Sequence, residues 1–477
     1  MAGLWTVRIK AAGEEMEMDI DRQKKFEQKI KEGTHDYSTE KDYVYPEDPI
    51  VKENLEWFQD QKLGFMIHWG PYSQLDVGCS WPLSDSDAIW CRDKRLDWDI
   101  SGEEFKKQYF DLNKTFNPIR FDPQKWAEEI QATGAKYLIF TTKHHDGFCM
   151  WDTKYSDYKI TAPDCPYHTN HYADVCANLF EACRKKGIAI AAYFSKADWH
   201  IDSYWSKDGE RGNYMDRGPS YNPEEHPERW EEFVQFTHNQ IRELAQNYGR
   251  IEVFWFDGGW VCEREGENIR LGEVIDEIRK FQPGMLCVDR TVGGPYENYV
   301  TPEQKVPEKP LLVPWESNLT LGTSFSYRFD DNYKSTREVL NLLIDIVAKG
   351  GNLAINVGPR PNGVLPETAM EQLKGMGRWL NQFGDAIYGT RVCAPYKKDG
   401  IAFTRKKDMI YAIETFDSDD AAVNEEIWIP YEGSVSRILY MENGKELPFE
   451  KKEGGYVVKL PEYCGEKAPL GRVFCLK

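Results

Sequence analysis

Short apolar runs recur along most of the chain, and longer segments with a different period separate them. The runs lie at residues 63–69, 136–142, 188–194, 251–256, 285–288 and 353–357. Between and after them, apolar residues recur every three or four positions, which predicts helices. These helices are expected over residues 123–132, 173–186, 228–248, 271–281, 336–349 and 366–383. Apolar strands that alternate with helices are typical of a parallel sheet covered on both faces. We therefore expect an α/β fold with a (β/α) TIM-like barrel, and an open doubly wound sheet is the alternative.

The pattern changes after residue 388. Six β-like runs with no helical period between them begin at Ile401, Met409, Glu426, Ser436, Tyr456 and Arg472. Such a series predicts a C-terminal antiparallel β-sandwich. Residues 1–48 are charged and lack a sustained apolar period, which predicts an N-terminal leader that packs against a domain. The expected organisation is a leader over 1–48, a catalytic barrel over 49–388 and a sandwich over 389–477.

The charge of the chain excludes several classes of partner. It has 60 Lys and Arg against 79 Asp and Glu, a formal net charge of −19, and its basic residues are scattered. Such a surface repels phosphate backbones and anionic lipids, so we expect neither nucleic acid nor a membrane as a partner. No apolar run approaches the ~18 residues of a membrane-spanning helix. This negative charge does not repel a neutral glycan.

The eleven cysteines indicate a reducing compartment. Their number is odd, they form no C-x-x-C pair, and most lie in apolar stretches such as MLCVD and RVFCLK. Buried free thiols are the simplest interpretation, and they favour a cytoplasmic location. The first residues also lack the continuous apolar segment of an export signal. A periplasmic or secreted protein whose signal has been removed is the alternative.

Polar and aromatic residues directly follow four of the predicted strands. The four clusters are 68–70 (HWG), 143–147 (KHHDG), 195–199 (SKADW) and 257–260 (DGGW). Any one of them is compatible with ordinary turn chemistry, such as an Asp-Gly pair after a strand. Together they describe the C-terminal mouth of a parallel barrel, where strand ends converge on one substrate. The sequence therefore predicts an active site at this mouth.

Two carboxylates at such a mouth would support glycoside hydrolysis. Asp257 follows the apolar run IEVFWF and precedes two glycines, which suits a nucleophile held at a strand end. The stretch 289–316 offers four proton donors, Glu297, Glu303, Glu308 and Glu316. A carboxyl separation of about 5–5.5 Å gives retention of configuration, and a wider gap gives inversion. Aromatic residues near the strand ends supply flat faces for a sugar ring.

A metal centre is the weaker interpretation of the same residues. His144 and His145 are adjacent, but the sequence contains no H-E-x-x-H helix and no Cys/His knuckle. Neither a phosphate loop G-x-x-x-x-G-K-[ST] nor a nucleophile elbow G-x-S-x-G occurs. We therefore expect no metal and no cofactor.

Four strings, taken in order, resemble a known family. WFQDQKLGFMIHWGPYS, GAKYLIFTTKHHDGFCMWDTKYSDY, IEVFWFDGGW and the later WES…SFSY are similar to the catalytic domain of glycoside hydrolase family 29, the α-L-fucosidases. The resemblance runs from about residue 49 to residue 388. It implies a (β/α) barrel followed by a β-sandwich, exo-acting retaining hydrolysis of terminal α-L-fucosyl residues, and no metal in the chemistry. The implied partner is a fucosylated oligosaccharide or glycoconjugate.

The resemblance also implies roles for individual residues. The aspartate of the W-F-D-G strand end, Asp257, matches the nucleophile. The acid/base is less uniform in position within the family; a T-x-E pattern matches Glu303, with Glu297 as the alternate and Glu316 as a third candidate. The residues that match substrate-binding positions or the G-C-S-W stretch are His68, Trp81, His144, His145, Tyr193, Arg290 and Phe325.

One departure from the family concerns the sugar. Members often carry Glu-Trp about a dozen residues after the H-W-G histidine, and that glutamate grips sugar hydroxyls, whereas here Ser80 precedes Trp81. A serine cannot give a bidentate, charged hydrogen bond. A related sugar such as an α-L-galactoside is therefore an alternative substrate, unless Asp85 or Asp87 substitutes. A homologue that binds carbohydrate without cleaving it is the alternative from another functional class.

Overall fold

Seven parallel strands form the central sheet of the protein. The structure, a computed structural model, describes residues 41–84, 102–205 and 217–477. In chain order the strands are β1 (Leu63–Ile67), β2 (Tyr137–Lys143), β3 (Ala189–Ser195), β4 (Val253–Asp257), β5 (Leu286–Asp289), β6 (Glu316–Thr320) and β7 (Asn352–Val357). They lie in the order β5-β4-β3-β2-β1-β7-β6, so that β7 returns to β1. This is the cyclic order of a barrel, and the predicted fold class is confirmed.

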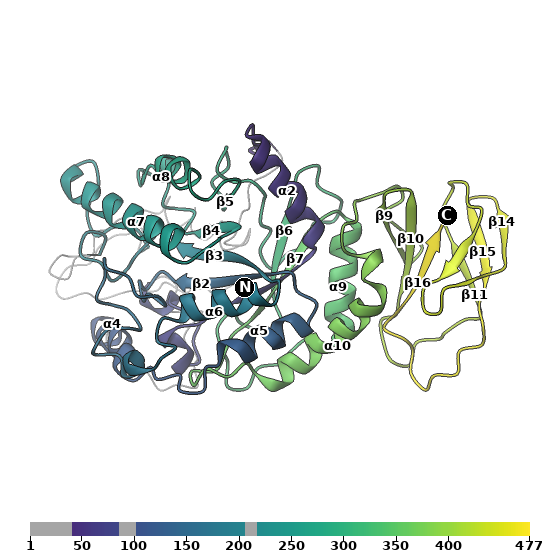
Figure 1. The fold of residues 1–477 in the computed structure, drawn as a ribbon, viewed down its shortest axis with the longest axis horizontal. Coiled ribbons are helices and arrows are strands. Elements are labelled where there is room, and N and C mark those ends of the chain that lie inside the picture. Colours follow the sequence, from purple (N-terminus) through teal and green to yellow (C-terminus); the bar gives the residue numbers. More distant parts are fainter. Residues whose placement is uncertain (1–40, 85–101, 206–216) are drawn as a thin grey trace, which may run out of the picture. The chain divides into compact units, whose positions relative to one another are not determined.

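Helices connect the strands and cover the sheet (Figure 1). They are α2 (Pro49–Gln61), α4 (Gly102–Phe110), α5 (Pro123–Ala132), α6 (Val175–Lys185), α7 (Pro227–Asn247), α8 (Leu271–Ile278), α9 (Thr336–Ala348) and α10 (Glu367–Phe383). The six helices predicted from apolar periodicity all form. Asp-Pro pairs start two of the helices, because Asp48 and Asp122 accept hydrogen bonds from backbone N–H groups of the first turns of α2 and α5.

Helix α2 lies against one end of the barrel interior. Its residues Val51, Leu55 and Phe58 belong to the same buried cluster as inward-facing residues of β1 to β5 and β7. Phe58 stacks on Tyr299 with ring centroids 4.0 Å apart. The chain leaves α2 directly into the N-terminal end of β1, so this helix covers the end of the barrel opposite the mouth.

An irregular segment, residues 298–304, fills the gap between β5 and β6, which do not pair with each other. The backbone N–H of Asn298 donates to the Cys287 carbonyl of β5 at 2.8 Å, and the N–H of Gln304 donates to the Asn318 carbonyl of β6 at 3.0 Å. Glu303 lies on this segment, next to its contact with β6. The segment therefore completes the barrel wall while it carries one of the candidate carboxylates.

Strand β6 was not expected from the sequence. Its residues, ESNLT, include a single apolar side chain, so no apolar run marks it. The strand is nonetheless buried along its whole length, and Glu316 accepts hydrogen bonds from the Tyr137 hydroxyl and from Trp255 Nε1. Because Glu316 and Ser317 find hydrogen-bond partners inside the protein, this part of the strand can be buried without an apolar pattern.

The C-terminal part forms two antiparallel sheets with a shared core, as predicted. Their strands are β8 (Lys397–Lys398), β9 (Ile401–Lys406), β10 (Met409–Thr415), β11 (Glu426–Ile429), β12 (Ile438–Tyr440), β13 (Lys445–Glu446), β14 (Phe449–Lys452), β15 (Gly455–Lys459) and β16 (Gly471–Leu476). One sheet has the order β13-β12-β16-β10-β9-β8 and the other β11-β15-β14. Phe403 and Phe474 of the first sheet share a buried cluster with Ile429 and Val458 of the second.

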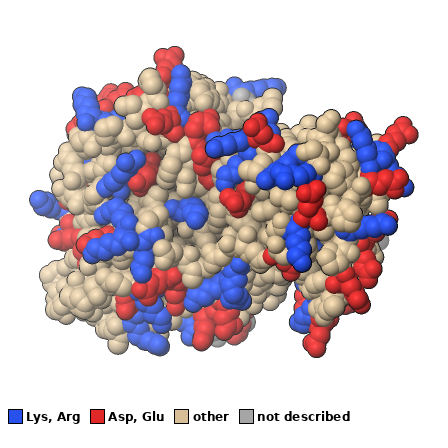
Figure 2. All heavy atoms as spheres, turned by 45° about the vertical axis from the view of Figure 1, so that its right-hand side comes forward, with Lys and Arg blue, Asp and Glu red and all other residues tan. Residues whose placement is uncertain are grey.

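Several sequence-based expectations about the surface and the thiols can be compared with the structure. Figure 2 shows Lys and Arg side chains interspersed with Asp and Glu over the face in view. The ten cysteines in the described ranges are unpaired and eight of them are buried, as expected for free thiols. No helix in these ranges is long and apolar enough to cross a membrane. The predicted leader falls almost wholly outside the described residues.

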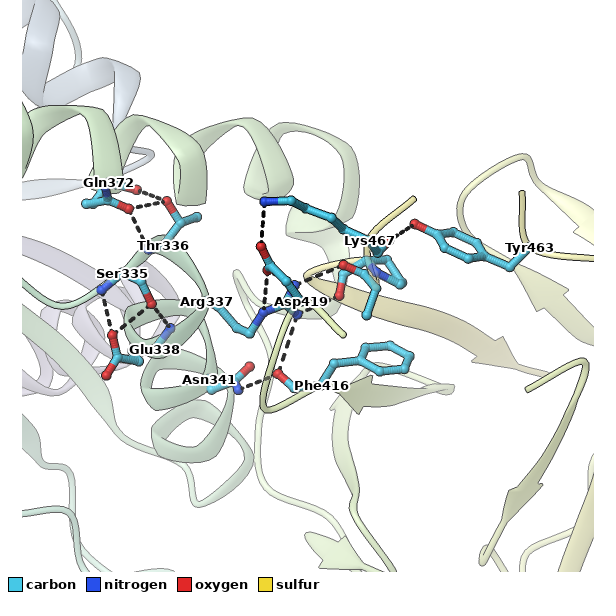
Figure 3. Close-up of polar contacts among 12 residues, drawn as sticks. Ser335, Thr336, Arg337, Glu338, Asn341, Gln372, Phe416, Asp419, Tyr463 and Lys467 are labelled. Atoms are coloured by element: carbon cyan, nitrogen blue, oxygen red, sulfur yellow. Dashed lines mark hydrogen bonds and ion pairs between the residues drawn. The ribbon is translucent and has the colours of Figure 1, made fainter. Parts of the chain in front are cut away.

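One buried arginine joins helix α9 to the sandwich (Figure 3). The Arg337 side chain donates to the carbonyl oxygens of Ala468 at 2.9 Å and of Pro469 at 2.7 Å, and to Asp419 Oδ1 at 2.7 Å. Lys467, which is exposed, binds the other oxygen of Asp419 at 2.7 Å. Arg337 thus satisfies backbone acceptors that lie between the two parts of the fold.

We predict that Arg337→Ala lowers the free energy of unfolding by about 2–3 kcal/mol, because buried carbonyl oxygens lose their donor. The measurement is urea denaturation followed by tryptophan fluorescence. Lys467→Ala is the matched control, since it removes an exposed partner of the same carboxylate and should change stability little. Equal losses in the two variants would show that the buried contacts of Arg337 contribute nothing beyond a surface ion pair.

Candidate active site

The side chains predicted for the active site gather at the C-terminal ends of the barrel strands. His68 directly follows β1, His144 and His145 follow β2, Asp257 ends β4, and Arg290 follows β5. The other members of the set come from the same end of the fold: Tyr193 from the last part of β3, Glu303 from the closing segment, and Phe325 from the loop after β6. The contacts below join all of them.

Asp257 is held by two donors from neighbouring strands. The Tyr193 hydroxyl donates to Oδ2 at 2.6 Å, and Arg290 Nη1 donates to Oδ1 at 2.8 Å. Gly259, two residues on, allows this arrangement, because a Cβ there would lie 1.9 Å from Thr291 Oγ1 and 3.1 Å from the Arg290 carbonyl. The glycine pair after the strand thus gives the loop that carries Arg290 room to approach the carboxylate.

The charge of Asp257 is stabilised by its surroundings. Burial alone would raise the pKa of Asp257, but the guanidinium of Arg290 and the hydrogen bond from the Tyr193 hydroxyl hold it well below the usual range of an aspartate. Burial and the neighbouring Asp257 raise the pKa of Tyr193, so the phenol keeps its proton and remains a donor. Asp257 is therefore an ionised, oriented carboxylate at neutral pH.

Arg290 also binds a second carboxylate. Its Nη2 donates to Glu303 Oε2, while Nη1 holds Asp257, and the guanidinium lies 4.9 Å over the ring of Trp255. The side chains of Arg290, Glu303 and Asp257 retain 6, 7 and 13% exposure, so the most open of the three is Asp257. One planar cation thus binds both carboxylates.

Three non-glycine residues next to the site have left-handed backbone. Cys79 before Ser80 has φ 52°, Thr291 after Arg290 has φ 69°, and Gln304 after Glu303 has φ 51°. This region is costly for residues with a Cβ, most of all for a β-branched one such as Thr291. The surrounding contacts therefore impose these conformations, and each one directs an adjacent site residue.

The three histidines pack around one another beside Asp257. The ring centroids of His144 and His145 lie 4.2 Å apart, and those of His68 and His144 lie 5.6 Å apart. His145 Nε2 is 3.7 Å from Asp257 Oδ2. Burial is the main cause that lowers the pKa of His68 and of His145 to about 4 and that of His144 well below its ordinary value. All three rings are therefore neutral at pH 7, and each carries a single ring proton.

Hydrogen bonds behind the site define where two of these protons lie. The Asn356 amide donates to the Phe325 carbonyl at 2.7 Å, so its oxygen faces His68 Nδ1, which must donate across 2.8 Å. The Ser195 hydroxyl donates to the Ala197 carbonyl at 2.7 Å and therefore accepts from His145 Nδ1 at 2.6 Å. In both histidines Nε2 is left with a lone pair and acts as an acceptor.

Aromatic rings line the same space. Trp81 lies 4.7 Å from His145, and Phe325 lies 4.9 Å from His68. Tyr193 stacks on Trp255 at 5.3 Å. Trp199 and Trp260, each also in ring contact with Trp81, extend this wall. Polar ring nitrogens beside flat apolar faces suit the hydroxyl edge and the C–H face of a sugar ring.

The other candidate carboxylates occupy different positions. Glu297 accepts backbone N–H groups of Thr291 at 3.1 Å and Gly293 at 2.7 Å, so it holds the turn after β5. Glu316 lies at the start of β6, is fully buried and binds side chains of the barrel interior. The contact with Arg290 distinguishes Glu303 from both, and the geometry favours it as the partner of Asp257.

Within the described ranges, one group of side chains has ligand atoms close enough together to be considered as a metal site. His144, His145 and Asp257 have ligand atoms within 4.8 Å of one another. The carboxylate of Asp257, however, already binds Arg290, and a guanidinium at 2.8 Å opposes a second cation on the same group. The side chains present therefore fit a metal poorly and fit a neutral polar ligand well.

The residues that anchor the histidines were not all found from the sequence. Asn356 was overlooked, although an asparagine inside the apolar run LAINV is a signal that could have been used, and Ser195 was placed at the mouth with the cluster 195–199 but without a role of its own. Ser80, which the sequence marked as a departure, lies behind His144 with its Oγ 2.5 Å from Nδ1. Asp85 and Asp87, the suggested substitutes, lie outside the described residues.

Comparison with known proteins identifies the family and agrees with the fold. A family model described as Alpha-L-fucosidase matches residues 32–385. Plasma alpha-L-fucosidase of Homo sapiens is 28% identical over 360 residues, which cover 70% of this chain and 69% of that protein.

Solved structures extend the likeness over the C-terminal sandwich. Alpha-L-fucosidase isoenzyme 1 from Paenibacillus thiaminolyticus has a TM-score of 0.72 and 26% identity, and the match covers 90% of this chain and 99% of that one. The Thermotoga maritima alpha-fucosidase in complex with fucose has a TM-score of 0.69 and 28% identity, with 91% and 100% covered.

We predict that His68 makes folding stability depend on acidity. Its pKa is about 4 in the folded protein against 6.5 when exposed, so the unfolded chain binds more protons between these values. Stability is therefore complete above pH 6.5 and falls as the pH decreases toward 4, by up to about 3 kcal/mol for this group. In urea denaturation between pH 4.5 and 7.5, His68→Gln should show a shallower decline than the wild type.

The control for this prediction is His226→Gln, because the His226 side chain is 54% exposed. Its stability should follow the wild-type pH dependence. A His68→Gln curve parallel to that of the wild type would contradict the assignment of a buried neutral histidine.

Proposed function

The chain belongs to the alpha-L-fucosidase family of glycoside hydrolases, and on that premise we propose that it removes terminal α-L-fucosyl residues from glycans by double displacement with retention. One observation supports this proposal above the others. A single guanidinium, that of Arg290, joins two buried carboxylates at the mouth of the barrel, beside three neutral histidines and an aromatic wall.

Asp257 acts as the nucleophile in this proposal. It is ionised because Arg290 and Tyr193 stabilise its charge, and both donors fix the plane of the carboxylate. The anomeric carbon bound between Asp257 and Glu303 would be attacked by Asp257, which forms a covalent glycosyl-enzyme and releases the aglycone oxygen. Attack by a held anion avoids the reorganisation that a free carboxylate would need.

Glu303 acts as the acid and then as the base. In the first step its proton passes to the leaving oxygen, and in the second step its carboxylate takes a proton from water that attacks the glycosyl-enzyme. The charge of Arg290 suits this cycle. Asp257 loses its negative charge when it forms the ester, and the guanidinium then faces the carboxylate of Glu303 alone, which favours the ionised base at the moment it is needed.

The histidines and aromatic rings hold the sugar. His68 and His145 carry unprotonated Nε2 atoms as acceptors for sugar hydroxyls, and Trp81 and Phe325 supply apolar faces beside them. Because the rings are neutral, they add no charge that would compete with Arg290 for the two carboxylates. Specific hydroxyl recognition next to the reacting carbon orients the anomeric centre toward Asp257.

We predict rapid release of nitrophenol from 4-nitrophenyl α-L-fucoside, with α-L-fucose as the first anomer seen by proton NMR. Retention requires this order, because two inversions restore the starting configuration. A first-formed β anomer would contradict the double displacement. Parallel assays with α-L-galactoside and other nitrophenyl glycosides test the sugar, and sugar binding in calorimetry without any product would point to a carbohydrate-binding protein instead.

Azide should separate the roles of the two carboxylates. Asp257→Gly should lower turnover by about 10⁴-fold or more, and azide should restore it with β-L-fucosyl azide as product. Glu303→Ala, assayed with an activated aryl fucoside, should instead yield α-L-fucosyl azide, since azide attacks the glycosyl-enzyme from the other face.

Glu297→Gln is the matched control for the second carboxylate. It removes a charge that binds the turn after β5, so azide should neither rescue it nor appear in its product. An α-L-fucosyl azide from Glu297→Gln, together with its absence from Glu303→Ala, would transfer the acid/base role to Glu297.

A further inference from the structure

The three site histidines are anchored through the same ring atom but by different kinds of partner. Asn356 holds Nδ1 of His68 with an oxygen, and Ser195 holds Nδ1 of His145 with a hydroxyl whose proton is directed elsewhere. Both arrangements place the ring proton on Nδ1. The third histidine, His144, faces Ser80, and here the hydrogen bond has the opposite direction, with the serine as donor and the ring nitrogen as acceptor.

Ser80 has a simpler environment than Ser195. Its side chain is fully buried and does not cap the short helix that it precedes. Among the residues that the structure describes, its hydroxyl has one polar partner, His144 Nδ1 at 2.5 Å. If Nδ1 donated the hydrogen bond, the hydroxyl proton of Ser80 would be buried without an acceptor, which is costly. The hydroxyl therefore donates and Nδ1 accepts.

A neutral imidazole that accepts through Nδ1 must carry its proton on Nε2. His144 is neutral because burial, followed by the nearby His145 and His68, lowers its pKa well below the ordinary value. His144 as a whole residue retains 4% exposure, and Nδ1 is the ring nitrogen that faces Ser80. The opposite edge of the ring, with Nε2–H, is the edge available to a ligand.

We propose that Ser80 fixes His144 as the Nε2-protonated tautomer and so makes it the hydrogen-bond donor of the pocket, opposite in polarity to His68 and His145. The identification of the ligand as a sugar rests on the proposed function. The pocket then requires two groups that donate and one that accepts. A hydroxyl can donate or accept a hydrogen bond, but a fluorine or an ether oxygen can only accept one. The ligand hydroxyl that faces His144 is therefore the one that can be replaced by fluorine or by an ether oxygen.

The loop that holds Ser80 is fixed for this role. Cys79, immediately before Ser80, has left-handed backbone, and its N–H donates to Ser326 Oγ at 3.1 Å. Ser326 in turn donates to the Val77 carbonyl and follows Phe325, which lies against His68. The donor histidine and one acceptor histidine are thus positioned by two loops that bind each other.

The direct test is the tautomeric state of the imidazoles in the intact protein. The chain has nine histidines, so ¹⁵N-histidine labelling gives a tractable NMR spectrum, and His144→Gln identifies the signal of interest. We expect His144 as the Nε2–H tautomer near pH 7.5, and His68 and His145 as Nδ1–H tautomers. A signal from His144 protonated on Nδ1 would overturn the proposal.

The variant Ser80→Ala should release this constraint. We expect the His144 signal to move toward a mixture of tautomers, while Ser73→Ala leaves it unchanged. Ser73 is the matched control because it is equally buried and its hydroxyl has no hydrogen-bond partner in the described structure. An unchanged His144 tautomer in Ser80→Ala would show that Ser80 does not set it.

A kinetic test links the tautomer to the ligand. Aryl α-L-fucosides with a single hydroxyl at carbon 3 or 4 replaced by fluorine or by hydrogen are compared through kcat/KM. At the position facing His144, the wild type should prefer fluorine over hydrogen by about five- to tenfold, and Ser80→Ala should lose the preference. No preference at either carbon would overturn the assigned donor. Failure to hydrolyse any fucoside would instead contradict the proposed function, and the NMR result would still decide the tautomer.

Discussion

The attraction of one guanidinium for two carboxylates is the constraint on which the rest of the site depends. Asp257 comes from β4 and Glu303 from the segment that closes the barrel, and Arg290 between them stabilises the charge of Asp257 and, whenever Glu303 is ionised, that of Glu303 as well. Arg290 is itself supported from below by the face of Trp255. The adjacent Asp289 is bound by Lys196 of the neighbouring loop, so the whole strand end that carries the guanidinium is fixed.

The neutrality of the surrounding groups follows from that constraint. A protonated histidine beside Asp257 would weaken the hold of Arg290, and burial prevents this by lowering the pKa of His68 and His145 to about 4. Deeper in the barrel, Glu316 accepts hydrogen bonds from Tyr137 and Trp255, and burial raises its pKa to about 7. His68, His145 and Tyr193 thus surround Asp257 as uncharged groups, and the positive charge beside it is that of Arg290.

The sequence predicted the parts of the site that obey a regular period and missed those that do not. Asp257, His68 and His144 end apolar strands, so their place at the mouth followed from the barrel order alone. Strand β6 escaped because its buried face is polar, and Asn356 escaped because a single amide in an apolar strand resembles a tolerated core residue. The sequence could mark Ser80 as a departure, but its partner comes from a loop 64 residues away, and no local pattern encodes that contact.

The position of the acid/base illustrates why this part of the site resists prediction. Residues 298–304 have no strand period, and their register is set by backbone hydrogen bonds to β5 on one side and to β6 on the other. Those bonds, together with the left-handed Gln304, turn Glu303 toward Arg290, whereas Glu297 turns to the backbone of residues 291–293. Two glutamates six residues apart therefore have different surroundings for reasons that are entirely tertiary. The sheet fixes the position of a nucleophile that lies on a strand. An acid on the closing segment can instead lie at a different residue in a related chain, provided that its side chain still reaches the cation at the end of β5.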